Sequence, residues 1–135
     1  NTPLVNTEVT TIASSYIKTL NLGKSENIDM LNISYTVTPY IYSEDHYTFV
    51  ITNNNNKYII NYTLDNIIKS LNPHYFFRIS RMCIININSI KIITKHLNGR
   101  LKLSLNPEFK EEIYVSRNRV NDFLMWLDGN NSTIQ

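Results

Sequence analysis

The fold of this chain depends on one stretch, Phe77-Arg78-Ile79-Ser80-Arg81-Met82-Cys83-Ile84-Ile85-Asn86. Arg78 and Arg81 stand in a polar opening, and an unbroken apolar run from Met82 to Ile85 follows them. A short continuous run rich in β-branched residues is typical of a strand buried on both faces. Arginine suits phosphates and base edges because its planar guanidinium presents several donors in a fixed fork. The stretch predicts either two arginines held on a rigid support for a polyanion or a core strand entered through a solvated charged turn.

Basic residues are concentrated in the segment 74–119, although the formal net charge of the 135-residue chain is only +2. The segment contains nine Lys and Arg residues against three Glu residues, whereas the segments on either side of it are each net negative. A basic segment inside a near-neutral domain is typical of a protein that binds a polyanion. The ordinary alternative is a solvated charged face.

The single cysteine, Cys83, lies within the apolar run, where we expect a buried structural thiol and not a reactive one. A chain with one cysteine cannot form an internal disulfide, which suits a reducing compartment. No apolar segment approaches the length of a membrane span, and no signal peptide is visible. We therefore expect a cytoplasmic domain without a membrane partner. Because the chain begins at Asn1 and not at Met, we also expect a domain excised from a longer protein.

Three regions are expected along the chain: an N-terminal helix or linker at 1–27, a domain at 28–129 and a disordered tail at 130–135. In the first region apolar residues repeat at helical spacing from Val9 to Leu20, and Gly23 is a plausible C-cap. This amphipathic helix could pack on the domain, link it to a missing partner domain or mediate dimer contacts.

Short strands and turns dominate the prediction for 28–115. Alternating apolar residues favour strands at 33–37 and 47–51, a return strand at 57–62, and further strands at 90–97, 101–105 and 112–115. Thr63 can cap a helix that extends to Leu71. Asn98-Gly99 is a strong signal for a hairpin with a type I′ turn.

A final helix is predicted after Ser116, which can serve as its cap, with Val120, Phe123, Leu124 and Leu127 on the inner face and Gly129 at its end. Arg117 and Arg119 stand at the helix start, although the partial positive charge there favours acidic residues. The two arginines make sense if an anion binds against the free N–H groups of the helix start. They could equally point into solvent at a small cost.

The order and spacing of several motifs in 35–127 resemble the LytTR DNA-binding domain, the effector module of LytR/AlgR-type bacterial response regulators. The motifs are Arg-x-Ser-Arg-x-x-Ile-Ile-Asn at 78–86, Asn-Gly-Arg-Leu at 98–101, and Val-Ser-Arg at 115–117 opening an amphipathic run. The resemblance implies a mostly β fold of three antiparallel sheets packed in layers. It also implies that loops, and not a recognition helix, enter the grooves of double-stranded DNA.

The resemblance and the residue types together predict a set of DNA-contacting side chains. Arginine can pair with guanine and asparagine with adenine in the major groove, whereas lysines on strands would contact phosphates alone. The polar loop at 43–46 would also reach the DNA, although a solvated turn is the ordinary reading of its acids and histidine. The predicted contacts are His46, Arg78, Ser80, Arg81, Lys95, Lys102, Arg117, Asn118 and Arg119.

The leading interpretation is thus a sequence-specific DNA-binding domain of a bacterial transcriptional regulator. An upstream receiver or sensor domain and a homodimer on DNA are the further partners that this interpretation predicts. The alternative is a protein- or peptide-binding β-domain, which the nine Tyr and five Phe residues would permit. An enzyme is not expected, because the sequence has no catalytic triad, metal-ligand spacing or Gly-rich phosphate loop. No cofactor or metal is predicted.

Overall fold

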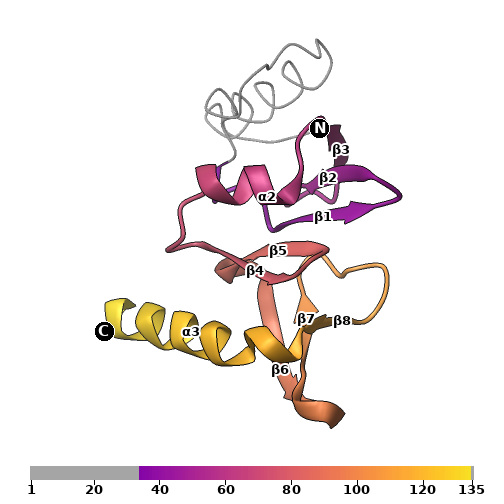
Figure 1. Ribbon diagram of the computed structural model, residues 1–135. Coiled ribbons are helices and arrows are strands. Elements are labelled where there is room, and N and C mark those ends of the chain that lie inside the picture. Colours follow the sequence, from indigo (N-terminus) through magenta and orange to yellow (C-terminus); the bar gives the residue numbers. More distant parts are fainter. Residues whose placement is uncertain (1–33, 135) are drawn as a thin grey trace.

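The computed structural model describes residues 34–134, which form two antiparallel sheets and two α-helices (Figure 1). The five-stranded sheet has the order β3-β2-β1-β5-β4, and the three-stranded sheet has the order β6-β7-β8. The strands are β1 (Tyr40–Glu44), β2 (Tyr47–Ile51), β3 (Lys57–Ile60), β4 (Phe76–Ser80), β5 (Cys83–Asn86), β6 (Ile90–Lys95), β7 (Leu101–Leu105) and β8 (Ile113–Val115). The α-helices are α2 (Leu64–Ile67) and α3 (Val120–Ile134), single 3-10 turns occupy Ile68–Ser70, Ile87–Ser89 and Arg117–Arg119, and Leu97–Gly99 forms the turn between β6 and β7.

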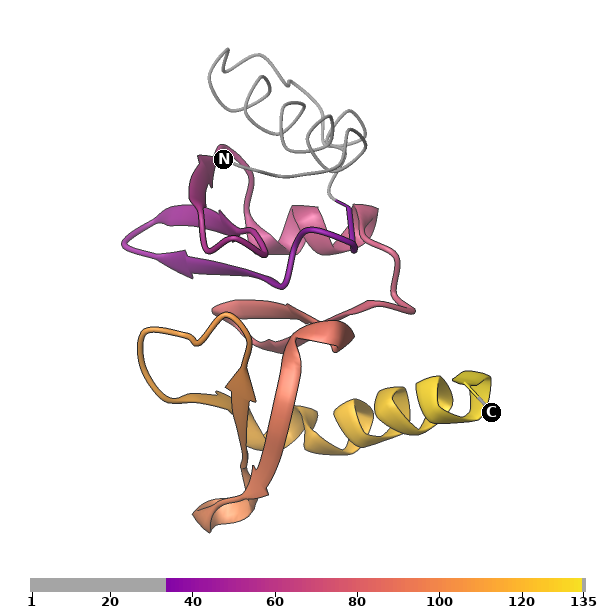
Figure 2. The same cartoon turned by 180° about the vertical axis from the view of Figure 1, so that it is seen from behind.

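The elements are stacked in layers, and the five-stranded sheet is the middle one. In Figures 1 and 2 α2 lies on one side of this sheet, and the three-stranded sheet lies on the other side with α3. Two apolar clusters fill the spaces between the layers, one beneath α2 and one between the two sheets and α3. The prediction of a mostly β fold with short helices is therefore confirmed.

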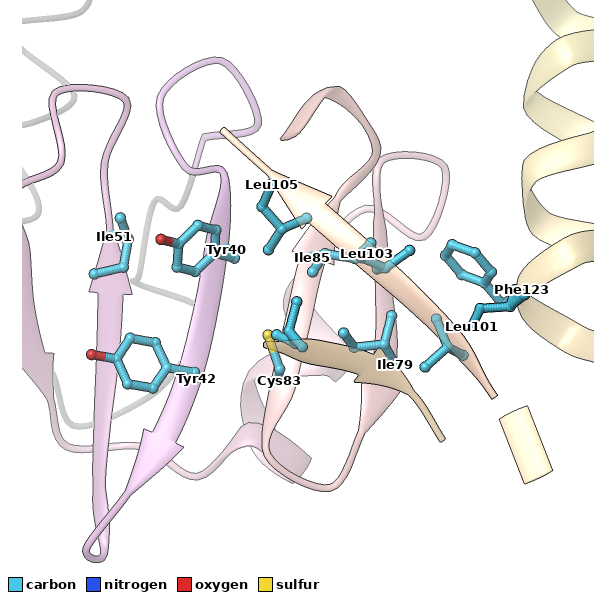
Figure 3. Close-up of a cluster of buried hydrophobic side chains, with 12 residues drawn as sticks. Tyr40, Tyr42, Ile51, Ile79, Cys83, Ile85, Leu101, Leu103, Leu105 and Phe123 are labelled. Atoms are coloured by element: carbon cyan, nitrogen blue, oxygen red, sulfur yellow. The ribbon is translucent and has the colours of Figure 1, made fainter. Parts of the chain in front are cut away.

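Strand β5 is buried on both faces, as the apolar run predicted. Cys83 and Ile85 point into the cluster that the three-stranded sheet and α3 complete (Figure 3). Ile84 belongs to the other cluster, beneath α2. Successive side chains of a strand face opposite sides, so one short strand contributes to both cores. Met82 was predicted to belong to this buried run, but it lies in the turn before β5 and is 50% exposed.

The described residues form two sheets in place of the three that were expected. The reason is the antiparallel pairing of β1 with β5, in which Tyr40 faces Ile85 and Tyr42 faces Cys83. This pairing joins the β1–β3 meander and the β4–β5 hairpin edge to edge into one sheet. A third sheet is therefore absent from residues 34–134.

Several local predictions are confirmed. The hydroxyl of Thr63 accepts a hydrogen bond from the amide of Asn66 (3.2 Å) and so caps α2. Asn98 and Gly99 both have positive φ, as a type I′ turn between β6 and β7 requires. Asn55, in the four-asparagine turn before β3, also adopts a left-handed conformation.

Two predictions about strands are wrong. The strand expected at 33–37 is displaced, because residues 35–37 form a turn and β1 begins only at Tyr40, after Pro39. The hydroxyl of Ser34 accepts a hydrogen bond from the amide of Thr36 (3.1 Å), and such local bonds compete with strand pairing. The polar opening around Arg78 is also not a solvated turn, since Phe76–Ser80 forms strand β4, which pairs with β5.

Val120, Phe123 and Leu127 lie on the inner face of α3 as predicted, but Leu124 does not. Phe123 is fully buried and Trp126 packs on Phe77 with ring centroids 5.2 Å apart, whereas Leu124 is largely exposed. The helix also continues through Gly129 to Ile134, where the sequence predicted its end and a tail. The side chain of Asn130 donates to the backbone carbonyl of Trp126 (3.0 Å), so the turn beyond Gly129 is held from within the helix. The amphipathic helix predicted for 1–27 lies outside the described residues.

Candidate nucleic-acid interface

Two hairpin turns lie side by side at one end of the five-stranded sheet. Asp45 and His46 form the β1–β2 turn with φ values of 54° and 70°, the left-handed pair that a type I′ hairpin needs. The β4–β5 turn lies beside it, because the amide of Ser43 donates to the carbonyl of Met82 (2.8 Å). The side chains of both turns border a groove of about 480 Å³, so the structure brings together the predicted residues His46, Arg78 and Arg81.

The start of the C-terminal helical segment joins these turns. The guanidinium of Arg119 donates from Nη1 to the carbonyl of Arg78 (3.4 Å), and Ser116 bonds to the carbonyl of Ile79. Arg117–Arg119 therefore lies next to the last residues of β4. Ser116 precedes this helical turn as predicted, but its hydroxyl does not cap it, because that hydroxyl is used on β4.

Arg117 and Asn118 are both exposed, and Arg117 lies beside the β6–β7 turn. A side chain added at Gly99 would place its Cβ 3.4 Å from the Cδ of Arg117, so the stem of this arginine lies against the turn. The left-handed φ of +73° also favours glycine at that position. The basic surface thus extends from the two hairpin turns, past the helix start, to the end of the three-stranded sheet.

The guanidinium of Arg78 is mostly enclosed, and it is bonded to other groups of the protein in this structure. Only 16% of its side chain is exposed, and it forms an ion pair with Asp65 of α2 through Nη1. Its Nε donates to the carbonyl of Ser80 (3.1 Å), and its Nη2 donates to the carbonyl of Arg81 (2.9 Å). The hydrogen bond and the charge of Arg78 hold the pKa of the Asp65 carboxyl below its usual value.

Arg81 and Ser80 have different surroundings within the same turn. Arg81 is exposed and borders the groove, so its guanidinium is available to a ligand. The hydroxyl of Ser80 accepts a hydrogen bond from the amide of Met82 (3.1 Å). Ser80 therefore shapes the turn that presents Arg81.

The two predicted phosphate-binding lysines are not among the residues that border this groove. Lys102, on β7, forms an ion pair with Glu112 (3.2 Å), and it borders a second hollow on the three-stranded sheet together with Glu108 and Glu111. Lys95 is exposed at the end of β6, the edge strand of that sheet. A phosphate that reached Lys102 would have to compete with these carboxylates.

A basic and aromatic cluster at the β6–β7 turn was not predicted from the sequence. The guanidinium of Arg100 lies 4.1 Å from the ring centroid of Tyr114, and the ring of His96 lies 4.9 Å from the same ring. Part of the signal was present in the sequence, because residues that flank a short hairpin turn, here His96 and Arg100, face each other across the strands. Asp65 was missed as well, and no local pattern marks it as the partner of Arg78.

Glu44, the last residue of β1 before the β1–β2 turn, already has an intramolecular partner. Glu44 pairs with Lys110, and this hydrogen bond lowers the pKa of the Glu44 carboxyl. The repulsion that Glu44 would exert on a phosphate near His46 is reduced as a result.

Within residues 34–134, no group of three or more His, Cys, Asp or Glu side chains could hold a metal ion. In the same part of the chain, none of the helices is long and apolar enough to cross a membrane.

Comparison with known proteins identifies the family. The family model of the LytTr DNA-binding domain matches residues 24–128. Because this match spans most of the chain, the protein belongs to the LytTR DNA-binding domain family, as the motifs at 78–86, 98–101 and 115–117 predicted.

A solved structure has the same fold. It is the LytTr DNA-binding domain of a protein from Bacillus cereus that is described as a methyl-accepting/DNA response regulator. The sequence identity is 24% and the TM-score is 0.63, and the similarity covers 70% of this chain and 84% of the other. No curated protein matches the chain.

Proposed function

We propose that this domain binds double-stranded DNA in a sequence-specific manner through the turns and the helix start described above. One observation carries the proposal: the β1–β2 turn, the β4–β5 turn and the segment Arg117–Arg119 converge at one end of the five-stranded sheet. Each of the three presents a basic or amide side chain. Side chains gathered on rigid turns can be aimed at base edges, whereas basic residues on a flexible surface would contribute charge alone.

The exposed residues have distinct proposed roles. Arg81 reads a base in the major groove, where arginine pairs bidentately with guanine. Asn118 is a second base reader, and His46 contacts the DNA from the neighbouring hairpin. Arg117 and Arg119 bind phosphates, since the helix start adds N–H donors for an anion. Lys95 and Lys102 contact the DNA backbone, and Ser80 shapes the β4–β5 turn. None of the three reads a base directly.

The proposed context is the effector domain of a bacterial transcriptional regulator in a two-component system, acting in the cytoplasm. The family supports this context, as does the description of the Bacillus cereus protein as a response regulator. A receiver or sensor domain upstream and a homodimer on DNA belong to the same proposal. No catalytic role is proposed.

Selection of bound duplexes from a random double-stranded library tests the proposal, followed by titration of the selected and a scrambled duplex at several salt concentrations. The wild-type domain should prefer the selected duplex. Arg81→Ala should lose about 1–3 kcal/mol of that preference at one base position. Lys91→Ala is the matched control, because Lys91 is an exposed cation on β6 and does not border the groove; it should keep the preference.

Two outcomes would overturn the proposal. The first is a library selection that enriches no sequence. The second is passage through heparin at moderate salt without retention, which is the behaviour expected of a domain that binds only proteins or peptides.

A further inference from the structure

The groove beside the two hairpin turns contains one carboxylate that the proposed DNA contacts do not use. Asp65 is the second residue of α2, its side chain is 79% exposed, and it borders the groove together with Arg78 and Arg81. A carboxylate at a DNA-binding surface repels phosphate. Its position therefore calls for a role that outweighs this repulsion.

Arg78 connects Asp65 to the β4–β5 turn. Its guanidinium binds the Asp65 carboxylate at one end and the carbonyls of Ser80 and Arg81 at the other. A guanidinium is planar, and three partners around its edge fix its orientation. The register of β4 against β5 shifts between Arg78 and Ser80, so the bound carbonyls lie just after an irregularity that the strand pairing alone does not hold.

Arg78 holds Arg81 through the backbone carbonyl of Arg81. The Nη2 atom of Arg78 binds that carbonyl at 2.9 Å, while the Arg81 side chain stays exposed toward the groove. Fixing the backbone of a residue restricts the directions in which its side chain can project. The bonds from Arg78 thus restrict where the Arg81 guanidinium can reach.

We propose that Asp65 and Arg78 are positioning residues for DNA recognition: Asp65 orients Arg78, and Arg78 fixes the backbone of Arg81 so that its side chain meets a base. This inference rests on the proposed function. It assigns Arg78 an indirect role, whereas the sequence predicted a direct contact.

Asp65 has two effects on DNA binding, and removing it should change them in opposite directions. Asp65 is 79% exposed, and without it Arg78 keeps its hydrogen bonds to the carbonyls of Ser80 and Arg81, so the loss of Asp65 should leave the domain folded. Removing the negative charge should raise the affinity for every duplex. Loosening the contacts by which Arg78 holds the β4–β5 turn should lower the preference for the selected duplex over a scrambled one. The affinity ratio, and not the affinity itself, reports positioning.

Asp65→Ala tests the inference, with Asp45→Asn as the matched control. Asp45 is an exposed acid in the β1–β2 turn, and its carboxylate forms no ion pair with Arg78. Both variants should bind the scrambled duplex more tightly than the wild type. Asp65→Ala alone should lower the selected-to-scrambled ratio, by about two- to fivefold, the range expected for an ion pair whose acidic partner is exposed. Asp65→Glu, which keeps the carboxylate, should restore most of the ratio.

The Arg81→Ala background shows whether Asp65 acts through Arg81. There Asp65→Ala should leave the selected-to-scrambled ratio unchanged, because the side chain that it positions is gone. An unchanged ratio in Asp65→Ala alone would refute the inference. So would a fall that persists in the Arg81→Ala background, or a large loss of thermal stability in Asp65→Ala. In each of these outcomes the wild-type domain still prefers the selected duplex. If the proposed function is wrong, the wild type has no such preference, and the inference fails with it.

Discussion

Ser116 donates two hydrogen bonds to one atom, the carbonyl oxygen of Ile79: its amide donates at 2.9 Å and its hydroxyl at 3.1 Å. Ile79 lies on β4 of the five-stranded sheet, and Ser116 follows β8 of the three-stranded sheet. The pair therefore joins the two sheets at the point where α3 begins. It also places the arginines of the helix start next to the β4–β5 turn.

Ser116→Ala removes the hydroxyl bond and keeps the amide bond. We expect a loss of about 0.5–1.5 kcal/mol in the free energy of unfolding, the usual contribution of one hydrogen bond. Denaturant unfolding followed by circular dichroism measures it. The control is Ser104→Ala, at a half-exposed serine of β7, which should stay within about 0.5 kcal/mol of the wild type. Equal losses in the two variants would show that the Ser116 hydroxyl does not join the sheets.

Ile84→Ala should destabilise the domain by about 2–5 kcal/mol, because Ile84 is fully buried beneath α2 and its truncation leaves a cavity. Met82→Ala is the control, two residues away and half exposed, and it should change the free energy of unfolding much less. Urea titration of both variants makes the comparison. A small effect of Ile84→Ala would mean that β5 is not buried on both faces.

The raised pKa of Tyr40 predicts that the domain loses stability at alkaline pH. Burial is the main cause that raises the pKa of its hydroxyl from 10.0 to about 12. Between pH 10 and about 12 the unfolded chain releases this proton while the folded chain keeps it. The free energy of unfolding should therefore fall as pH rises through that window, and Tyr40 should contribute no such loss below pH 10.

Tyr40→Phe removes this titration and is nearly isosteric. Cys83, whose buried thiol also has a raised pKa, titrates in both proteins, so the difference between them reports Tyr40 together with its interaction with Cys83. The measurement is the difference in unfolding free energy between wild type and Tyr40→Phe, from pH 8 to about 12. A difference that does not change with pH would rule out the raised pKa.

Arg119→Ala should weaken binding to selected and scrambled duplexes alike and reduce the salt slope by about one unit. Arg119 lies at a helix start and already donates to the Arg78 carbonyl, a setting that suits a phosphate better than a base edge. Titrations at four salt concentrations give the slope. A loss confined to the selected duplex would reassign Arg119 to base reading.

The sequence by itself determined the features that depend on neighbours in the chain. The unbroken apolar run Met82–Ile85 predicted a strand buried on both faces, and Thr63 and Asn98-Gly99 predicted a helix cap and a hairpin turn. These features follow from side-chain alternation, local hydrogen bonding and left-handed φ, which act over a few residues. The order and spacing of the motifs also identified the family.

Only the tertiary structure decided which distant residues meet. Arg78 was expected to face DNA, but its ion-pair partner Asp65 lies 13 residues earlier, on another element. The number of sheets depends on the pairing of β1 with β5, whose strands are more than thirty residues apart. Local periodicity does not encode such pairings, because many strands and charges could satisfy the same pattern. Packing selects one arrangement, and here it left Arg81 exposed while it enclosed Arg78.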